Sequence, residues 1–135
     1  MNKKIIAIGL VIIIIIIVIS GTFDFALDES TISQTIFVDA VYDPKNNLVK
    51  ITYNDNSENT NLVILEILGM EQTFHKEFSQ NSFVEIIQIN SEPKYGWSTM
   101  PVVFSINHDE FGKIGLKTEI YQKDESKPRI IYSKI

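Results

Sequence analysis

The sequence predicts an all-β domain, an antiparallel β-sandwich of about seven or eight strands, preceded by one amino-terminal transmembrane helix. The first observation is an uncharged, isoleucine-rich run, IIAIGLVIIIIIIVISGTF, at residues 5–23. The second is the chain beyond Ser30, where short runs rich in β-branched and aromatic residues alternate with clusters of Asn, Asp, Ser, Gly and Pro. Such clusters at intervals of about eight to twelve residues are typical of sandwiches and barrels.

The apolar run has the length of a membrane-spanning helix. At 1.5 Å per residue its nineteen residues would extend for about 28 Å, close to the roughly 30 Å of a bilayer's hydrocarbon core. Lys3 and Lys4 precede the run and Asp24 follows it. The positive-inside rule therefore predicts a cytoplasmic amino terminus and an extracellular carboxyl-terminal part.

A cleaved signal peptide is the alternative interpretation of this run. The apolar core of a signal peptide is usually about 7–15 residues long and ends in a small-residue cleavage site. Val18 and Ser20 offer such a site, but the run is longer than a typical signal core and no Ala-x-Ala stretch follows it. A retained anchor is therefore favoured, and the lipid bilayer is the partner expected for residues 5–23.

The rest of the chain has the length of one domain. We assign residues 1–23 to the membrane anchor or signal segment. Residues 24–31, DFALDEST, are expected to be a short tether, and residues 32–135 one extracellular β-sandwich domain.

Charge and cysteine content exclude several classes of function. The part expected outside the cell carries ten basic and seventeen acidic residues, a net charge of −7, which disfavours binding to nucleic acid. The sequence contains no cysteine, so that disulfides and thiolate nucleophiles are excluded. Copper electron-transfer sites, which some small sandwiches carry, also need a cysteine ligand.

The first two strands are expected at residues 35–42 (TIFVDAVY) and 48–54 (LVKITYN). Residues 43–47 (DPKNN) between them predict a hairpin connection, because proline presets φ for a turn and asparagine tolerates a left-handed backbone. The alternating side chains expected to face the core are Ile36, Val38, Ala40, Tyr42, Val49, Ile51 and Tyr53.

Four later strands are expected at residues 62–68, 102–107, 113–123 and 129–135. The first of them, LVILEIL, is apolar on both faces except for Glu66, which predicts a strand buried at the centre of a sheet. Residues 102–107 and 113–123 are expected to pair with each other. In the second of these, the inward side chains are expected to be Ile114, Leu116, Thr118 and Ile120.

Residues 71–90, EQTFHKEFSQNSFVEIIQIN, carry a mixed signal. Phe74 and Phe78 are four residues apart, as on one face of a helix, and Lys76 interrupts a two-residue alternation. The enrichment in Thr, Phe, Val and Ile around a central SQNS favours two strands. We therefore predict two strands, with a single helix as the alternative.

The order LVILEILGMEQTFHKEFSQNSFVEII, then YGWSTMP, then VVFSINHDEFGKIGLKTEIY resembles immunoglobulin-like and fibronectin-III-like sandwiches of membrane-anchored archaeal or bacterial surface proteins. The resemblance covers roughly residues 35–123 and is one of pattern. The chain departs from immunoglobulins proper because it lacks both cysteines and has its tryptophan in a loop-like segment. The resemblance implies an immunoglobulin-like fold and a surface location, and it transfers no functional residue.

The two histidines do not have the close ligand spacing that is usual for metal sites. His75 lies between two phenylalanines and is interpreted as an exposed strand residue. His108, with Asp109 and Glu110, could contact a cation, but a solvated hairpin turn closed by Gly112 is the favoured interpretation.

Other motifs for metal binding or hydrolysis are incomplete. Asn54, Asn56 and Glu58 place oxygen atoms at alternate positions, but the glycine and distal glutamate of an EF-hand are missing. The sequence has no G-x-S-x-G motif, and neither histidine has a carboxylate partner that sequence alone can assign. We therefore predict no catalytic residue, no metal and no cofactor.

The loop EPKYGWSTMP at residues 92–101 is the best candidate for a partner-contact loop. It brings Tyr95, Trp97 and Met100 together, residue types that supply rigid contact area in binding surfaces. The alternative is that Trp97 fills one end of the sandwich core.

These observations predict a non-enzymatic, single-pass, membrane-anchored surface protein with a binding, adhesion or scaffolding role. Its expected partner is a protein or a surface layer. One alternative is an envelope-bridging, stator-like subunit of an archaellum or pilus-type machine. Another is a ligand-binding or enzymatic domain that uses the loop around Trp97.

Overall fold

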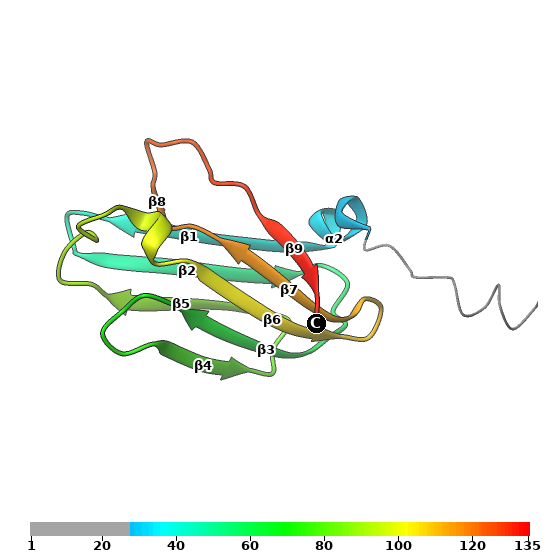
Figure 1. Ribbon diagram of the computed structural model, residues 1–135. Helices are drawn as coiled ribbons and strands as arrows, with labels where there is room; N and C mark the ends of the chain where they lie inside the picture. The colour runs from blue at the N-terminus through cyan, green and yellow to red at the C-terminus, as the bar shows by residue number, and fades with distance from the viewer. Residues whose placement is uncertain (1–27) are drawn as a thin grey trace, which may run out of the picture.

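The computed structural model describes residues 28–135, which form two packed β-sheets (Figure 1). The predicted anchor at residues 5–23 and the first part of the predicted tether lie outside the described residues. Within residues 28–135, no helix has the length and apolar character needed to cross a bilayer. The helices and strands are α2 (Glu29–Thr35), β1 (Ile36–Asp43), β2 (Leu48–Asp55), β3 (Thr60–Ile67), β4 (Phe74–Phe78), β5 (Ser82–Gln88), the 3-10 turn η1 (Trp97–Thr99), β6 (Val102–His108), β7 (Gly112–Thr118), β8 (Tyr121–Gln122) and β9 (Ile131–Lys134).

The strands are divided between a four-stranded and a five-stranded sheet. Sheet A has the order β5-β2-β1-β8, and sheet B has the order β4-β3-β6-β7-β9. All neighbouring strands are antiparallel except β8, which runs parallel to β1. The prediction of a mostly β domain built from two sheets is therefore confirmed.

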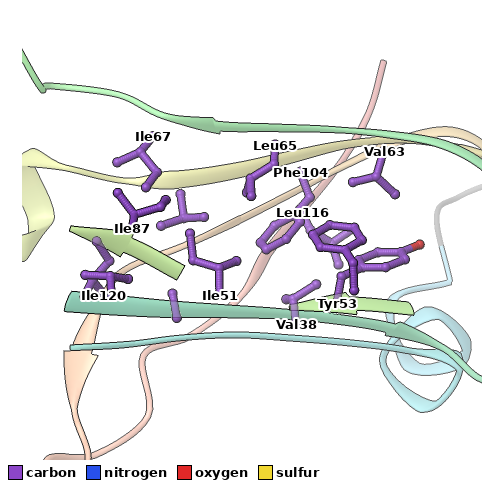
Figure 2. Packing of buried hydrophobic residues seen from close by; sticks show 14 of the residues in the cluster. Val38, Ile51, Tyr53, Val63, Leu65, Ile67, Ile87, Phe104, Leu116 and Ile120 are labelled. Carbon is purple, nitrogen blue, oxygen red and sulfur yellow. The ribbon is translucent and has the colours of Figure 1, made fainter. Parts of the chain in front are cut away.

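The core lies between the two sheets and follows the predicted alternation. Figure 2 shows Val38 and Ile51 of sheet A facing Leu65 and Phe104 of sheet B. Every side chain that the sequence assigned to the inward faces of β1 and β2 is buried: Ile36, Val38, Ala40, Tyr42, Val49, Ile51 and Tyr53. The turn between these strands forms where predicted, and Asn47 adopts a left-handed φ of 52°.

Helix α2 begins inside the segment that was expected to be a tether. The Asp28 side chain accepts a hydrogen bond from the Thr31 amide at 3.2 Å, which satisfies one of the free amides of the first turn. Ile32 then packs into the core and is fully buried. Asp28 therefore caps the helix and Ile32 fixes it to the core, so the end of the expected tether is part of the folded domain.

The strand expected at residues 113–123 is two strands. β7 ends at Thr118, and the chain crosses to sheet A, where β8 pairs with the last residues of β1. Ile120 lies between the two strands and is buried, as its place in the alternation predicted. The Tyr121 hydroxyl donates to Oδ1 of Asp39 at 2.8 Å and holds β8 against sheet A.

The two strands predicted within residues 71–90 are confirmed as β4 and β5. Phe78 and Phe83 stack with ring centroids 3.7 Å apart. Lys76 points inward at the edge of sheet B, where its Nζ lies 3.1 Å from the Glu85 carboxylate at the edge of sheet A. Lys76 interrupts the apolar alternation because it occupies an inward position, where its ion pair with Glu85 links the edges of the two sheets.

Strand β3 was expected to be buried on both faces, which is wrong for its outer face. β3 is the second strand of sheet B, and its outward residues Leu62 and Ile64 are only half-buried. Within residues 28–135, no further layer of structure covers this face of the sheet (Figure 1). The inward residues of β3, Val63, Leu65 and Ile67, are covered by sheet A, whereas the apolar residues on its outward face are partly open to solvent.

The sandwich has two distinct ends. The near end is where the described chain begins, and it also contains the β2–β3 and β6–β7 connections. The far end contains the β1–β2 turn, the β3–β4 loop and the long β5–β6 loop (Figure 1). The strands run between the two ends, so the far-end loops lie a full strand length from residue 28.

Candidate functional site

An open groove lies at the far end between the β3–β4 and β5–β6 loops. Its volume is about 1110 Å³. The lining residues are Gly69, Met70, Glu71, Gln72, Thr73, Phe74, His75, Asn90, Ser91, Glu92, Pro93, Lys94, Tyr95, Thr99 and Met100. Because binding residues are often carried by loops that a rigid scaffold positions, we take this open groove between two loops as the candidate functional site.

The two loops that form the groove are joined at their bases. The Leu68 amide donates to the carbonyl oxygen of Pro101 at 3.0 Å. Gly69 has a φ of +79°, and a Cβ at this position would lie 2.0 Å from the Thr99 carbonyl oxygen. Only glycine permits this backbone and this close approach, so Gly69 fixes the distance between the loops.

The β5–β6 loop is also held by hydrogen bonds of its own. The Gly96 amide donates to the Pro93 carbonyl at 3.1 Å, and the Thr99 hydroxyl donates to the Gly96 carbonyl at 2.7 Å. The Met100 amide donates to the Trp97 carbonyl at 3.0 Å. These bonds brace the loop from within.

The three residues predicted for partner contact have different environments. Tyr95 is 78% exposed and lines the groove, whereas Met100 is 8% exposed and belongs to the core. Trp97 is half-buried, and its ring centroid lies 4.9 Å from that of Tyr42. Trp97 and Met100 therefore anchor the loop, and Tyr95 is the aromatic residue that it presents.

The rest of the groove is rich in hydroxyl and amide groups. Gln72, Asn90 and Thr99 line it beside Tyr95, a mixture that resembles the surfaces of antibody loops. The Glu92 carboxylate is already used, because it accepts a hydrogen bond from the Gln122 side chain at 2.7 Å. Two further charged residues, Glu71 and Lys94, line the groove, and Nζ of Lys94 lies 5.5 Å from the centre of the Tyr95 ring. The groove therefore offers an aromatic ring with both charged and uncharged polar groups around it.

A second polar cluster lies buried at the near end, centred on Asp55. The Asp55 carboxylate accepts hydrogen bonds from the Ser57 hydroxyl at 2.6 Å and the Thr60 hydroxyl at 2.7 Å. The backbone amides of Ser57 and Asn59 donate to it at 2.8 and 3.0 Å, and Nε2 of His108 lies 3.1 Å away. Asp55 and His108 are both almost fully buried.

The hydrogen bonds of His108 rule out the arrangement of a catalytic triad. Its Nδ1 accepts from the backbone amides of Glu110 and Phe111 at 3.1 and 3.2 Å, so the proton of the neutral ring is on Nε2. Nε2 therefore donates toward both Asp55 and Ser57, which leaves no ring nitrogen free to remove the Ser57 proton. The cluster joins the β2–β3 loop to the end of β6.

The surroundings shift the pKa values of two groups in this cluster. Burial raises the pKa of the Asp55 carboxyl, but hydrogen bonds from Ser57, Thr60 and the nearby amides outweigh it, so the pKa is lowered overall. Burial raises the pKa of Tyr53 to about 12. The Tyr53 hydroxyl lies 2.7 Å from that of Thr60 and extends the network into the core.

His108 is buried, which corrects the expectation of a solvated turn. The turn closes on the ring itself, because two amides of the turn donate to it. The sequence did not pair His108 with Asp55, which is 53 residues away. One local signal was present, since an aspartate two residues before a serine often forms a side-chain turn of the kind seen at Asp55 and Ser57.

The remaining candidate ligands are dispersed. His75 is exposed on β4 as expected, with Nδ1 3.6 Å from Oε2 of Glu66. The side-chain amide nitrogen of Asn54, Nδ2, donates to the side-chain oxygen of Asn56 at 2.7 Å. In the described part of the chain, no group of three or more His, Asp or Glu side chains is placed to hold a metal ion.

Comparison with known proteins identifies no relative: no family model, no curated protein and no solved structure matches this chain.

Proposed function

We propose that this chain is a single-pass, membrane-anchored surface protein whose β-sandwich presents the far-end groove to a protein or glycan partner. The role is one of binding, adhesion or scaffolding and is non-enzymatic. The observation that carries the proposal is the position of the groove at the end of the strands opposite residue 28. An anchor at residues 5–23 would hold the near end at the bilayer and direct the groove away from it.

The chemistry of the groove supports binding. Tyr95 is the most exposed large hydrophobic residue among the described residues, and its loop is braced by Trp97 and Met100. A rigid aromatic residue with adaptable polar neighbours gives contact area at a low entropy cost. The net negative charge of the domain favours partners other than nucleic acid.

The strand order supports an immunoglobulin-like arrangement as the finer description of the fold. In that fold the first, second and fifth strands lie in one sheet, and the third, sixth and seventh lie in the other. The fourth strand differs, because constant-type immunoglobulin domains have it in the first of these sheets and this chain has β4 beside β3. Here sheet A contains β1, β2 and β5, and sheet B contains β3, β6 and β7. Sandwiches with this order commonly use their end loops for recognition.

The proposal is tested with the full-length chain in liposomes and with envelope material stripped from the same cells as the probe. Wild-type liposomes should bind this material, and Tyr95→Ala should remove most of the binding. Lys45→Ala is the matched control, because Lys45 is an exposed residue of the β1–β2 turn at the same end. Protease or glycosidase treatment of the envelope material then separates a protein partner from a glycan.

Two outcomes would contradict the proposal. One is equal binding by wild-type and Tyr95→Ala liposomes. The other is loss of binding in Lys45→Ala to the same extent as in Tyr95→Ala, which would show that the groove has no special part in recognition.

A further inference from the structure

The outer face of sheet B combines half-buried and exposed apolar residues with charges that are separated by strand. Leu62, Ile64 and Val103 are half-buried on this face, and Ile131 and Ile135 are 57% and 63% exposed. These residues come from β3, β6 and the carboxyl-terminal β9 segment, which are three of the five strands, and Lys113, Gly115 and Lys117 of β7 lie between β6 and β9.

The charges on this face lie on opposite sides of the central strand β6. Glu66 of β3 and Glu77 of β4 form an acidic side, with His75 between them at 3.6 Å from Glu66 and 3.9 Å from Glu77, and Lys113 and Lys117 of β7 form a basic side. The outward residues of β6 are uncharged. Among residues 28–135, neither of the two lysines forms a salt bridge.

The register places the key residues in one row across the sheet. Glu66 pairs with Val103, and Val103 pairs with Lys117. The same row continues to His75 on one side and Ile131 on the other. Val103 therefore lies at the middle, with the acidic and basic residues one strand away on either side.

We propose that this face binds a second copy of the same chain around a two-fold axis that runs parallel to the strands and passes over β6. Such an axis keeps each row at the same height and exchanges the two sides of the sheet. Glu66 then faces Lys117 of the second copy, and Val103 faces its own equivalent. A two-fold axis across the strands would place acidic strands on acidic strands, so the charges select the parallel axis.

The size of the face fits a weak dimer. The five strands are four to eight residues long, and with a spacing of about 4.8 Å and a rise of about 3.3 Å per residue they give a face of roughly 500 Å² per copy. Two such faces bury about 1,000 Å² in total, the lower limit for a specific interface. The proposed membrane anchor would raise the local concentration of the chain and favour pairing.

The parallel axis has a consequence for the two near ends. Because the axis runs along the strands, residue 28 of each copy lies at the same end of the dimer. Two copies in one membrane need this arrangement, and a perpendicular axis would prevent it. The pairing itself is inferred from sheet B alone, whereas this consequence and the raised local concentration rest on the proposed membrane location.

The absence of cysteine allows a direct test with single-cysteine variants of the full-length chain in membranes. Val103→Cys lies at the proposed axis, so a short bifunctional maleimide should link two copies into a dimer. Thr52→Cys on the outer face of sheet A is the matched control and should stay monomeric. A cross-link yield for Val103→Cys that does not exceed the yield for Thr52→Cys would overturn the proposal.

Charge reversal tests the relative placement of the two copies. Adding Glu66→Lys to Val103→Cys should abolish the cross-link, and adding Lys117→Glu as well should restore it. Failure of the second change to restore the cross-link would overturn the proposed pairing. The cross-link can be read on either side of a membrane, so its failure is distinguishable from failure of the proposed surface function.

Discussion

The carboxylate of Asp55 accepts hydrogen bonds from its own loop and from His108 at the end of β6. We expect Asp55→Asn to lower the free energy of unfolding by about 2–4 kcal/mol, because the amide presents a donor to groups that are themselves donors. Chemical denaturation measures this change. Asn56→Ala, at an exposed position next to Asp55, is the control and should change stability little.

The same carboxylate makes stability depend on pH in the acid range. Its pKa in the folded protein lies below the ordinary value of 3.8, so its contribution is complete above that value and is lost as pH falls through the folded pKa. Hydrogen bonds from Thr31 and Asn46 lower the pKa values of Asp28 and Asp43 in the same direction. We expect Asp55→Asn to flatten the loss of stability below about pH 4. If the free energy of unfolding of Asp55→Asn falls with decreasing pH as steeply as that of the wild type, Asp55 does not cause the loss of stability in acid.

Tyr95 and Trp97 are two residues apart and should respond differently to substitution. Trp97→Ala removes a ring that packs on Tyr42, and we expect it to lower the free energy of unfolding by about 2–3 kcal/mol. Tyr95→Ala removes an exposed ring and should change stability by less than about 0.5 kcal/mol. Thermal melts of both variants test the difference. Equal destabilisation would mean that Tyr95 is part of the core and not a presented contact residue.

At the scale of elements, the two loops of the groove depend on the close approach at Gly69. A methyl group there would lie 2.0 Å from a backbone oxygen, so we expect Gly69→Ala to destabilise the domain by about 2 kcal/mol or more and to separate the loops. Gly112→Ala is the control, because Gly112 also has a positive φ but has open space around it. Gly112→Ala should cost only about 1 kcal/mol. Similar costs for both variants would show that the contact with Thr99 does not matter.

The inward ion pair between β4 and β5 protects the open edges of the two sheets. Replacing Lys76 and Glu85 together by valine should leave the free energy of unfolding unchanged or raised, because apolar packing replaces an ion pair. The variant should nevertheless aggregate more readily during refolding, since inward charges on edge strands oppose edge-to-edge pairing. Light scattering measures this, with Lys50→Val/Glu119→Val as a control that removes one lysine and one glutamate outside β4 and β5. Equal scattering by both double variants would contradict the protective role.

Local sequence predicted most strands because their pattern is set by one buried face. The alternation from Ile36 to Tyr42 needs only the adjacent sheet, and the structure confirms it. The burial of the outer face of β3 could not be predicted, because an apolar run such as LVILEIL does not show whether one or both faces of the strand are covered. The break after Thr118 depends on where the chain crosses between sheets, which is a property of the whole fold.

The polar cluster and the groove needed information from distant parts of the chain. His108 and Asp55 meet because β3 aligns with β6 and leads back to the end of β2. The loop with Tyr95 was recognisable from its composition, but its partner wall, residues 69–75, was not. Sequence thus identified one side of the groove, and strand pairing supplied the other.

At the scale of the whole molecule, the two ends of the sandwich give the protein a direction. The described chain begins at the near end, and the β5–β6 loop, which carries Tyr95, is at the far end (Figure 1). If Lys3 and Lys4 hold the amino terminus in the cytoplasm, the far end is the part most distant from the membrane on the other side. A parallel dimer would then display two grooves on the same side, which increases avidity for a repetitive surface.

This direction can be tested with two single-cysteine variants of the full-length chain, since it has no native thiol. A membrane-impermeant maleimide should label Tyr95→Cys in intact cells, because that side chain is exposed and is expected outside. It should label Asn2→Cys only after lysis, because the lysines next to it favour the cytoplasmic side. Labelling of Asn2→Cys in intact cells, or of Tyr95→Cys only after lysis, would place the groove inside the cell. A surface partner would then be impossible, although pairing through sheet B would still stand because it is inferred from the apolar residues and charges of that face.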